Sequence, residues 1–508
     1  MLALLAAQFA WRSWRTHRIF NDTADEEIHI ACGLEVWELR KYRIEPQHPP
    51  LARVVLAALP HLYTQRARVH GTWWQSEDEE FYWRTLSLAR LGNLAFFPFL
   101  LLYANRWARA LYGPWAGLGA AFLVAVCPNL LAHASLATLD FGAATAIFAA
   151  AYHLWRWSRE PTRTALSLDA AIVFGLAALT KFSALFLAPA IGVALFAVSR
   201  TFPGVRKVLG FILVAALVVW AGYGFTFGTL PAVQFVPPPG TFQHKVQLAV
   251  ERIVGDARVP APVFWSGVLD MLGHNAGGHQ SYLLGEVSSK GWWYYFPVVL
   301  AVKSTLPLLA LAALGAAVGG RALAPAIAGA TLLAVCMMSN INLGVRHILA
   351  IYPLLAVLAS GAFASGRRAI LAGALGLAAW HGAESLAAHP DYLAYFNQIA
   401  RGREERFLLD SNLDWGQDLQ RLRIYLRENR IQNVYLSFFG RGEPIRRRIP
   451  GARPLPPHQR PAGWIAVSQA HLVGLALPGY NLGWLKNFEP RARIGRSILV
   501  YYFPEPPL

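Results

Sequence analysis

The stretch that decides the fold class is residues 166–199, LSLDAAIVFGLAALTKFSALFLAPAIGVALFAVS, in which only Asp169 and Lys181 are charged. An α-helix that crosses the hydrocarbon core of a bilayer needs about 20 largely apolar residues. The stretch is long enough for two helices, 166–181 and 182–199, or for one bent and tilted unit. It therefore predicts a protein embedded in a membrane.

Similar apolar segments recur through most of the first 386 residues. We interpret eleven as spans: 1–20, 86–105, 114–132, 134–155, 166–181, 182–199, 208–229, 292–317, 323–340, 344–364 and 368–386. The first is apolar only to Ala10, so it could instead be a mis-assigned start or an interfacial helix. Of the 508 residues, 55% are hydrophobic and 15% charged, against about 25% charged in a soluble domain. The sequence thus predicts a multi-pass α-helical membrane module over 1–386 with about 11 spans, and excludes a soluble or disulfide-stapled chain.

The net charge is strongly basic, with 46 Lys and Arg against 29 Asp and Glu. Basic chains often bind nucleic acid, but here the arginines cluster in short loops between apolar segments, the pattern that orients membrane proteins. The loops that contain Arg106, Arg156, Arg200 and Arg367 alternate along the chain and are predicted to be cytoplasmic. We therefore expect no nucleic-acid partner, a cytoplasmic N-terminus and a C-terminus outside.

Three long polar segments fall on the outer side in this topology: 21–85, 230–290 and 387–508. The first is rich in acids and aromatics, which suits helices that lie on the bilayer surface. The third contains an amphipathic stretch at 421–427, and its apolar alternation predicts strands at 434–439, 463–468 and 497–502. We therefore predict a small extracytoplasmic α/β domain over residues 387–508.

Ionisable residues at membrane depth are costly and are functional candidates by default. In the predicted topology they gather on the outer face. The acidic group is Asp25, Glu26 and Asp140, and the basic group is Lys181, Arg346 and His347. Carboxylates can take a proton from a hydroxyl, and clustered cations can hold a departing phosphate. The joint placement of the two groups predicts a site for a phosphate that is attached to a lipid.

Each of these residues also has a structural interpretation. Asp25 and Glu26 could be charges at a helix N-terminus, or could bind a divalent metal together with His29. Asp140 could accept hydrogen bonds from neighbouring backbone. Lys181 could extend to lipid headgroups, and the remaining cations could anchor the ends of spans.

Short stretches that contain these residues follow one another in order: 23–29 (TADEEIH), 46–53 (PQHPPLAR), 137–140 (ATLD), 175–182 (GLAALTKF), 278–285 (GHQSYLLG), 295–297 (YFP), 342–347 (NLGVRH), 389–397 (HPDYLAYFN) and 410–419 (DSNLDWGQDL). As an ordered set they resemble the phospholipid-carrier-dependent glycosyltransferases of the GT-C class. That class includes protein O-mannosyltransferases and the aminoarabinose transferases that act on lipid A. The resemblance covers nearly the whole chain and implies a GT-C type fold in the inner membrane.

The resemblance implies an inverting transfer of one sugar from a polyprenyl-phosphate carrier to an acceptor hydroxyl on the outer side of the membrane. By matching position, Asp25 would be the base that deprotonates the acceptor, with Glu26 beside it and Asp140 as a second acid of the site. The basic group would hold the carrier phosphate on the opposite side of the sugar. No metal is expected to be required. The acceptor could be a protein, a glycan or a lipid.

Four further residues are candidates for substrate contact: His48, His279, Lys303 and Asp414. The tail stretch 410–419 could touch the acceptor, or it could be a capped helix start. Two other classes of protein stay open, namely a transporter or flippase of a lipid-linked sugar and an assembly subunit. Transporters often show paired repeats, which we do not find in this sequence, and neither class needs an acidic group opposite a basic one.

Overall fold

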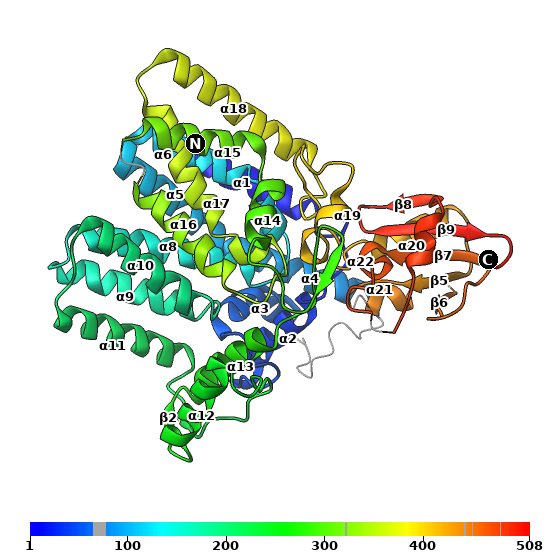
Figure 1. Ribbon diagram of the computed structural model, residues 1–508, viewed down its shortest axis with the longest axis horizontal. Coiled ribbons are helices and arrows are strands. Elements are labelled where there is room, and N and C mark those ends of the chain that lie inside the picture. Colours follow the sequence, from blue (N-terminus) through cyan, green and yellow to red (C-terminus); the bar gives the residue numbers. More distant parts are fainter. Residues whose placement is uncertain (65–77, 321–322, 441–442, 450, 478, 508) are drawn as a thin grey trace.

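The computed structural model describes residues 1–64, 78–320, 323–440, 443–449, 451–477 and 479–507 (Figure 1). The helices in the first half are α1 (Leu2–Trp14), α2 (Glu26–Leu39), α3 (Pro50–Thr64), α4 (Glu79–Asn93), η2 (Leu94–Phe96), α5 (Phe97–Tyr112), α6 (Pro114–Ala125), α7 (Pro128–Ala134), α8 (Asp140–Arg159), α9 (Thr164–Ala178), α10 (Ala184–Ser199), α11 (Val205–Gly222) and α12 (Phe242–Val254).

The second half continues with α13 (Pro262–Gly277), α14 (Tyr295–Lys303), α15 (Leu306–Val318), α16 (Leu323–Met337), η3 (Val345–Ile348), α17 (Ile351–Ala359), η4 (Ser360–Ala364), α18 (Arg368–Ala387), α19 (Glu404–Phe407), η5 (Asp410–Asn412), α20 (Leu419–Glu428), α21 (Glu443–Arg447), α22 (Gln469–Leu472) and η6 (Gly483–Asn487). The strands are β1 (Phe227–Gly228), β2 (Val259–Pro260), β3 (Ser281–Leu283), β4 (Glu286–Ser288), β5 (Val434–Ser437), β6 (Ala452–Pro454), β7 (Gly463–Ser468), β8 (Ala492–Ile494) and β9 (Ile498–Phe503).

Proline and glycine mark several breaks between the helices. Gly113, with φ of +97°, follows α5, and Pro114 begins α6. Proline is favoured at the first helical position because it has no N–H to leave unpaired there. α6 and α7 are bent by 59° where Pro128 begins α7, and α14 and α15 are bent by 106° after Lys303. The second bend leaves Lys303 at a helix end inside the protein.

By length and hydropathy, two helices of the described residues can cross a membrane, Glu79–Tyr112 and Val205–Gly222, or up to four if each bent pair is one span. Most predicted segments do correspond to apolar helices, and 166–199 forms two of them, α9 and α10. These have 15 and 16 residues. Such helices are about 24 Å long at 1.5 Å per residue, which is shorter than the ~30 Å hydrocarbon core. The count of about 11 spans therefore stays a prediction.

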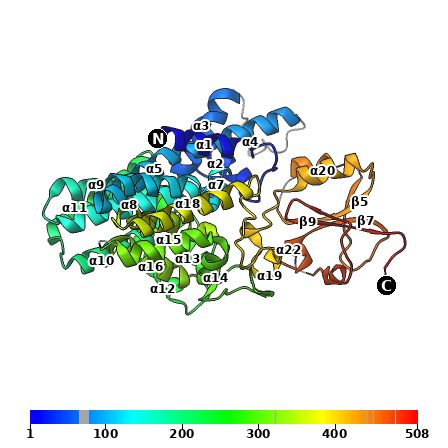
Figure 2. The ribbon, with the colours of Figure 1, turned by 90° about the horizontal axis from the view of Figure 1, so that it is seen from above.

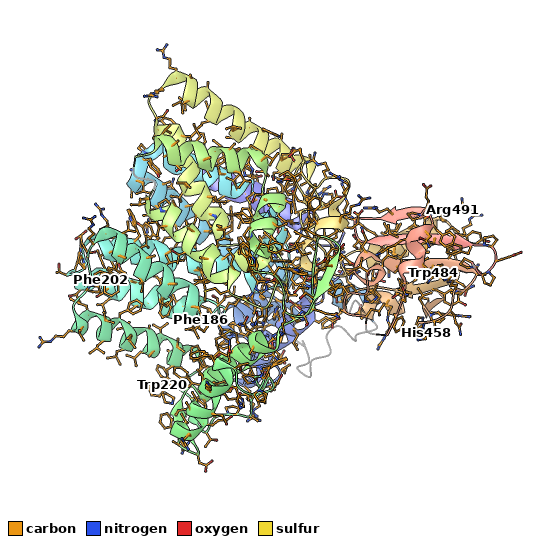
Figure 3. All side chains as sticks on the ribbon, in the orientation of Figure 1. Phe186, Phe202, Trp220, His458, Trp484 and Arg491 are labelled. Carbon is orange, nitrogen blue, oxygen red and sulfur yellow. The ribbon has the colours of Figure 1, made fainter. Side chains whose placement is uncertain are left out.

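Most of the helices lie together at one end of the molecule, and a five-stranded sheet lies at the other end together with α20, α21 and α22 (Figures 1 and 2). The strand order is β6-β5-β7-β9-β8, in which β5 runs parallel to β6 and β7 while β9 runs antiparallel to β7 and β8. The three strands predicted from the sequence are present as β5, β7 and β9. Side chains on both ends are shown in Figure 3, with Phe202 and Trp220 on the helical end and Trp484 and Arg491 on the sheet.

The sheet is joined to the helices by a shared apolar cluster. Leu34 of α2 and Leu86 of α4 belong to the same buried cluster as Leu426 of α20 and Val500 of β9. The other face of the sheet has its own cluster, which includes Ile465. Because α20 covers one face and also packs toward α2 and α4, the segment just before α20 is held close to the start of α2.

Candidate active site

A cavity of about 290 Å³ is lined by residues of α8, α10, α13, α14, α16 and η3. Four predicted site residues lie on its wall: Asp140, Lys181, Arg346 and His347. Much of the remaining wall is apolar: Ile147, Phe186, Leu187, Met271, Leu272, Val335, Met338 and Leu349. Phe186 of α10 is labelled in Figure 3. A wall that combines charged groups with a large apolar surface suits an amphiphilic ligand.

Lys181 and Asp140 form an ion pair on this wall. Lys181 Nζ lies 2.6 Å from Asp140 Oδ1, and their side chains are 16% and 3% exposed. Asp140 is the first residue of α8, where the helix dipole favours a negative charge. Lys181 follows α9 in a turn that Thr180 stabilises by donating its hydroxyl to the carbonyl of Ala177. Two separate helix ends thus bring these charges together.

Arg346 and Asp25 form a second ion pair. Arg346 Nη1 lies 2.6 Å from Asp25 Oδ2, and the Asp25 side chain is 35% exposed. Asp25 immediately precedes α2, and Arg346 lies in η3. Arg346 Nε is buried and has no hydrogen-bond partner among the residues the structure describes. Arg346 therefore has an N–H donor left for a ligand, and the Asp25 side chain remains partly exposed on the surface of the protein.

This pairing differs from the arrangement that the sequence predicted. We expected the acids and the cations to face each other across a sugar, but Asp25 contacts Arg346 and Asp140 contacts Lys181 directly. The physical reason is that a buried charge without a partner is costly. Oppositely charged side chains that the fold brings to one place therefore pair.

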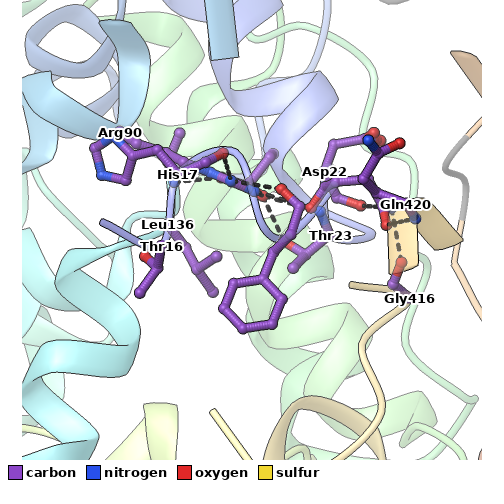
Figure 4. Close-up of polar contacts among 12 residues, drawn as sticks. Thr16, His17, Asp22, Thr23, Arg90, Leu136, Gly416 and Gln420 are labelled. Carbon is purple, nitrogen blue, oxygen red and sulfur yellow. Dashed lines mark hydrogen bonds and ion pairs between the residues drawn. The ribbon is translucent and has the colours of Figure 1, made fainter. Parts of the chain in front are cut away.

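Glu26 does not belong with the residues that line the cavity. Its carboxylate is fully buried and accepts hydrogen bonds from Arg90 Nε at 2.8 Å and Arg90 Nη2 at 2.7 Å, and from the backbone N–H of Ala137 at 2.6 Å. Arg90 also donates to the carbonyls of His17, Phe20 and Asn21 (Figure 4). Glu26 thus connects the segment before Asp25 to α4 and to the loop before Asp140.

Sequence reasoning missed Arg90 as a partner. It lies in the apolar segment 86–105, and an arginine inside such a segment signals a buried charge pair. The cavity residues Asn275 and Ser339 were missed as well, because nothing in their local sequence distinguishes them.

The three residues considered for a metal do not converge. Asp25 contacts Arg346, Glu26 contacts Arg90, and Arg53 Nε lies 3.2 Å from His29 Nδ1. Within the described ranges, no group of three or more His, Cys, Asp or Glu side chains is arranged to hold a metal ion.

His48 lies beside His29, and the centroids of the two rings are 5.6 Å apart. Burial lowers the pKa of His48 to about 4, with Lys181 contributing in the same direction. The imidazole is therefore neutral near pH 7 and can exchange hydrogen bonds with a polar ligand.

None of the four candidates for substrate contact is among the residues that line the cavity. Lys303 is fully buried, and its ammonium donates to the carbonyls of Leu393 at 2.8 Å and Asn412 at 2.7 Å. This cation thus fixes the start of the tail against α14. His279 lies beside His274, with ring centroids 5.5 Å apart.

Asp414 is also fully buried, and its Oδ2 accepts from the backbone N–H of Ala470 at 2.9 Å. Asp414 lies five residues before α20, whose N-cap is Asp418, so Asp414 does not cap that helix. The tail stretch instead connects the helices to the sheet. Burial raises the pKa of Asp414 to about 7, against an opposing contribution from the hydrogen bond to Ala470.

The raised pKa of Asp414 predicts a pH-dependent stability. The folded state binds this proton more tightly than the unfolded chain, whose Asp has a pKa of 3.8, so the stabilising contribution is complete below that pH and is lost as the pH rises through about 7. The difference in unfolding temperature between Asp414→Asn and the wild type, measured in detergent, should therefore shift in favour of the variant as the pH rises from 5 to 8. A constant difference across this range would show that Asp414 does not titrate there.

No protein-family model matches the sequence, and no curated protein matches it. Among solved structures, ArnT from Cupriavidus metallidurans bound to undecaprenyl phosphate aligns with a TM-score of 0.55 and 14% identity over 98% of this chain and 97% of that chain. The apo structure of the same protein aligns with a TM-score of 0.50 over the same shares. The chain has the ArnT fold. The alignment runs over nearly the whole of both chains, so this fold agrees with the one that the resemblance of the sequence predicted.

Proposed function

We propose that the protein is a glycosyltransferase that moves one sugar from a polyprenyl-phosphate carrier to an acceptor hydroxyl. The observation that carries this proposal is the cavity that combines Asp140, Lys181, Arg346 and His347 with an apolar wall. The cations suit a phosphate, and the apolar wall suits the first units of a prenyl chain. An ArnT structure with the same fold binds undecaprenyl phosphate, a ligand of this chemistry.

The proposed chemistry gives each of these charges a role. Asp25 takes the proton of the acceptor hydroxyl, the resulting oxygen attacks the anomeric carbon, and the bond between that carbon and the phosphate oxygen breaks. Lys181 and Arg346 stabilise the negative charge on the departing lipid phosphate. A single displacement of this kind inverts the configuration at the anomeric carbon.

The ion pair between Arg346 and Asp25 gives the donor a further role. The phosphate competes with Asp25 for Arg346, whose Nη1 contacts Asp25 Oδ2 at 2.6 Å. Binding of the donor thereby releases the Asp25 carboxylate to accept a proton. Glu26, fully buried against Arg90, positions Asp25 and does not touch the substrate.

The proposal is tested with the purified protein in nanodiscs and a panel of polyprenyl-phosphate sugars, with sugar transfer and released polyprenyl phosphate as readouts. Lys181→Met should raise the donor KM by about 10- to 100-fold, since a charge-assisted contact to phosphate contributes about 1.5–3 kcal/mol. Because this change leaves Asp140 buried without its cation, the double variant Lys181→Met/Asp140→Asn serves as a folded comparison. Arg163→Ala removes an exposed cation of the pair with Glu160 and should behave as the wild type.

A transporter or flippase of a lipid-linked sugar is the alternative outcome. If no donor in the panel is consumed while a lipid-linked sugar crosses the membrane of proteoliposomes, the transferase proposal is wrong. If transfer occurs and Lys181→Met keeps the wild-type KM, the reaction stands but the phosphate does not bind where we place it.

A further inference from the structure

Trp415 contacts Arg346 and the residue before Asp25. Its indole ring lies under the Arg346 guanidinium, with 4.5 Å between the guanidinium carbon and the ring centroid. Its backbone carbonyl accepts a hydrogen bond at 3.2 Å from the N–H of Ala24, the residue before Asp25. The side chain is 1% exposed. One residue of the tail thus supports two charges that are 321 positions apart in the sequence.

The residues just before Trp415 hold the loop that carries Arg346. Asn412 Oδ1 accepts from the backbone N–H of Val345 at 3.0 Å, and the Ser411 hydroxyl donates to the carbonyl of Leu343. Gly344 has a φ of +128°, and a Cβ there would lie 2.7 Å from Ser411 Oγ. The tail and this loop therefore approach too closely for a side chain at position 344.

The residues on either side of Trp415 are fixed to the sheet end of the molecule. Asp414 accepts from the N–H of Ala470, and Asp418 Oδ2 accepts from the hydroxyl of Ser497 at 2.8 Å. On the other side, Asn21 Nδ2 donates to the carbonyl of Gly416 at 2.8 Å. The stretch 410–418 is thereby held between the sheet and the two segments that carry the charge pair.

We infer that Trp415 is a positioning residue that presents Arg346 to the donor phosphate, and that stretch 410–418 makes the sheet part of the catalytic unit. This inference rests on the proposed function. A cation over the face of a Trp is attracted electrostatically to the ring, which restricts the positions that the guanidinium can take. The tail stretch thus acts through Arg346, and we do not assign it to the acceptor.

The inference is tested by the affinity of the full-length protein for undecaprenyl phosphate, a probe that needs no sugar and no acceptor. Trp415→Leu should weaken binding by about tenfold, because a desolvated cation–π contact is lost. Trp415→Phe keeps an aromatic face and should restore most of the affinity. In an Arg346→Ala background, Trp415→Leu should have no further effect, since the ring then has no cation to hold.

Two results would overturn the inference. One is an equal loss from Trp415→Leu with and without Arg346, which would mean that the tryptophan is needed only for folding. The other is a Trp415→Phe variant that binds no better than Trp415→Leu. If the wild type itself binds no undecaprenyl phosphate, the proposed function fails and the inference fails with it. This result is distinguishable from the other two, which concern only the Trp415 variants.

Discussion

Replacing Asp25 with asparagine is expected to lower kcat for sugar transfer by about 10²- to 10⁴-fold, the range for loss of a general base, with a donor KM that is unchanged or lower because the neutral amide competes less with the phosphate for Arg346. Asparagine has the same size, and its amide oxygen can still accept the hydrogen bond from Arg346 Nη1 that Asp25 Oδ2 accepts. It has no basic oxygen that takes a proton from the acceptor. The substitution therefore separates proton transfer from the positioning of Arg346.

The comparison variant for this measurement is Asp169→Asn, which changes an exposed carboxylate on α9 and should leave kcat and KM as in the wild type. If Asp25→Asn also keeps the wild-type kcat, Asp25 serves only to hold Arg346 and another group is the base. If the donor KM rises while kcat is unchanged, Asp25 belongs to the phosphate site. Initial rates at saturating acceptor distinguish these results.

The sequence was sufficient to predict that four of the charged residues lie together. Asp140 and Lys181 lie at ends of apolar segments, so the topology alone brings them to the same level, and both line the cavity with Arg346 and His347. It was not sufficient to tell where each side chain points. Successive residues of a helix turn by about 100°, so Asp25 reaches Arg346 while Glu26 reaches Arg90.

Contacts between segments that are distant in the chain could not be predicted from the sequence either. The tail stretch 410–419 contains several acids, and acids near a helix start predict a cap. In the structure, Asp414 and Asp418 contact Ala470 and Ser497, more than 50 residues further along the chain. No local pattern encodes such a partner, because it depends on how α20 and the sheet pack against α2 and α4.

The buried pair Glu26–Arg90 is where we expect the largest effect on stability. Both side chains are 0% exposed and lie 2.7 Å apart, so Glu26→Ala leaves the Arg90 charge buried, with carbonyls as its remaining hydrogen-bond partners among the described residues. Removing one partner of a buried ion pair costs about 3–5 kcal/mol. Glu80→Ala removes one partner of the exposed Arg18–Glu80 pair and should cost about 0–1 kcal/mol. Denaturant unfolding of the detergent-solubilised protein measures both.

A double variant shows what the pair does beyond folding. Glu26→Leu/Arg90→Met replaces both charges by apolar side chains of similar size, and such replacements often recover most of the lost stability. The Glu26 carboxylate, however, also accepts from the N–H groups of Thr23 and Ala137, which lie near Asp25 and Asp140. We therefore expect the double variant to regain stability over Glu26→Ala but to keep a reduced kcat, because these two loops lose their common acceptor. Full recovery of kcat together with stability would mean that the pair serves folding alone and that Asp25 is positioned by Arg346 and Trp415.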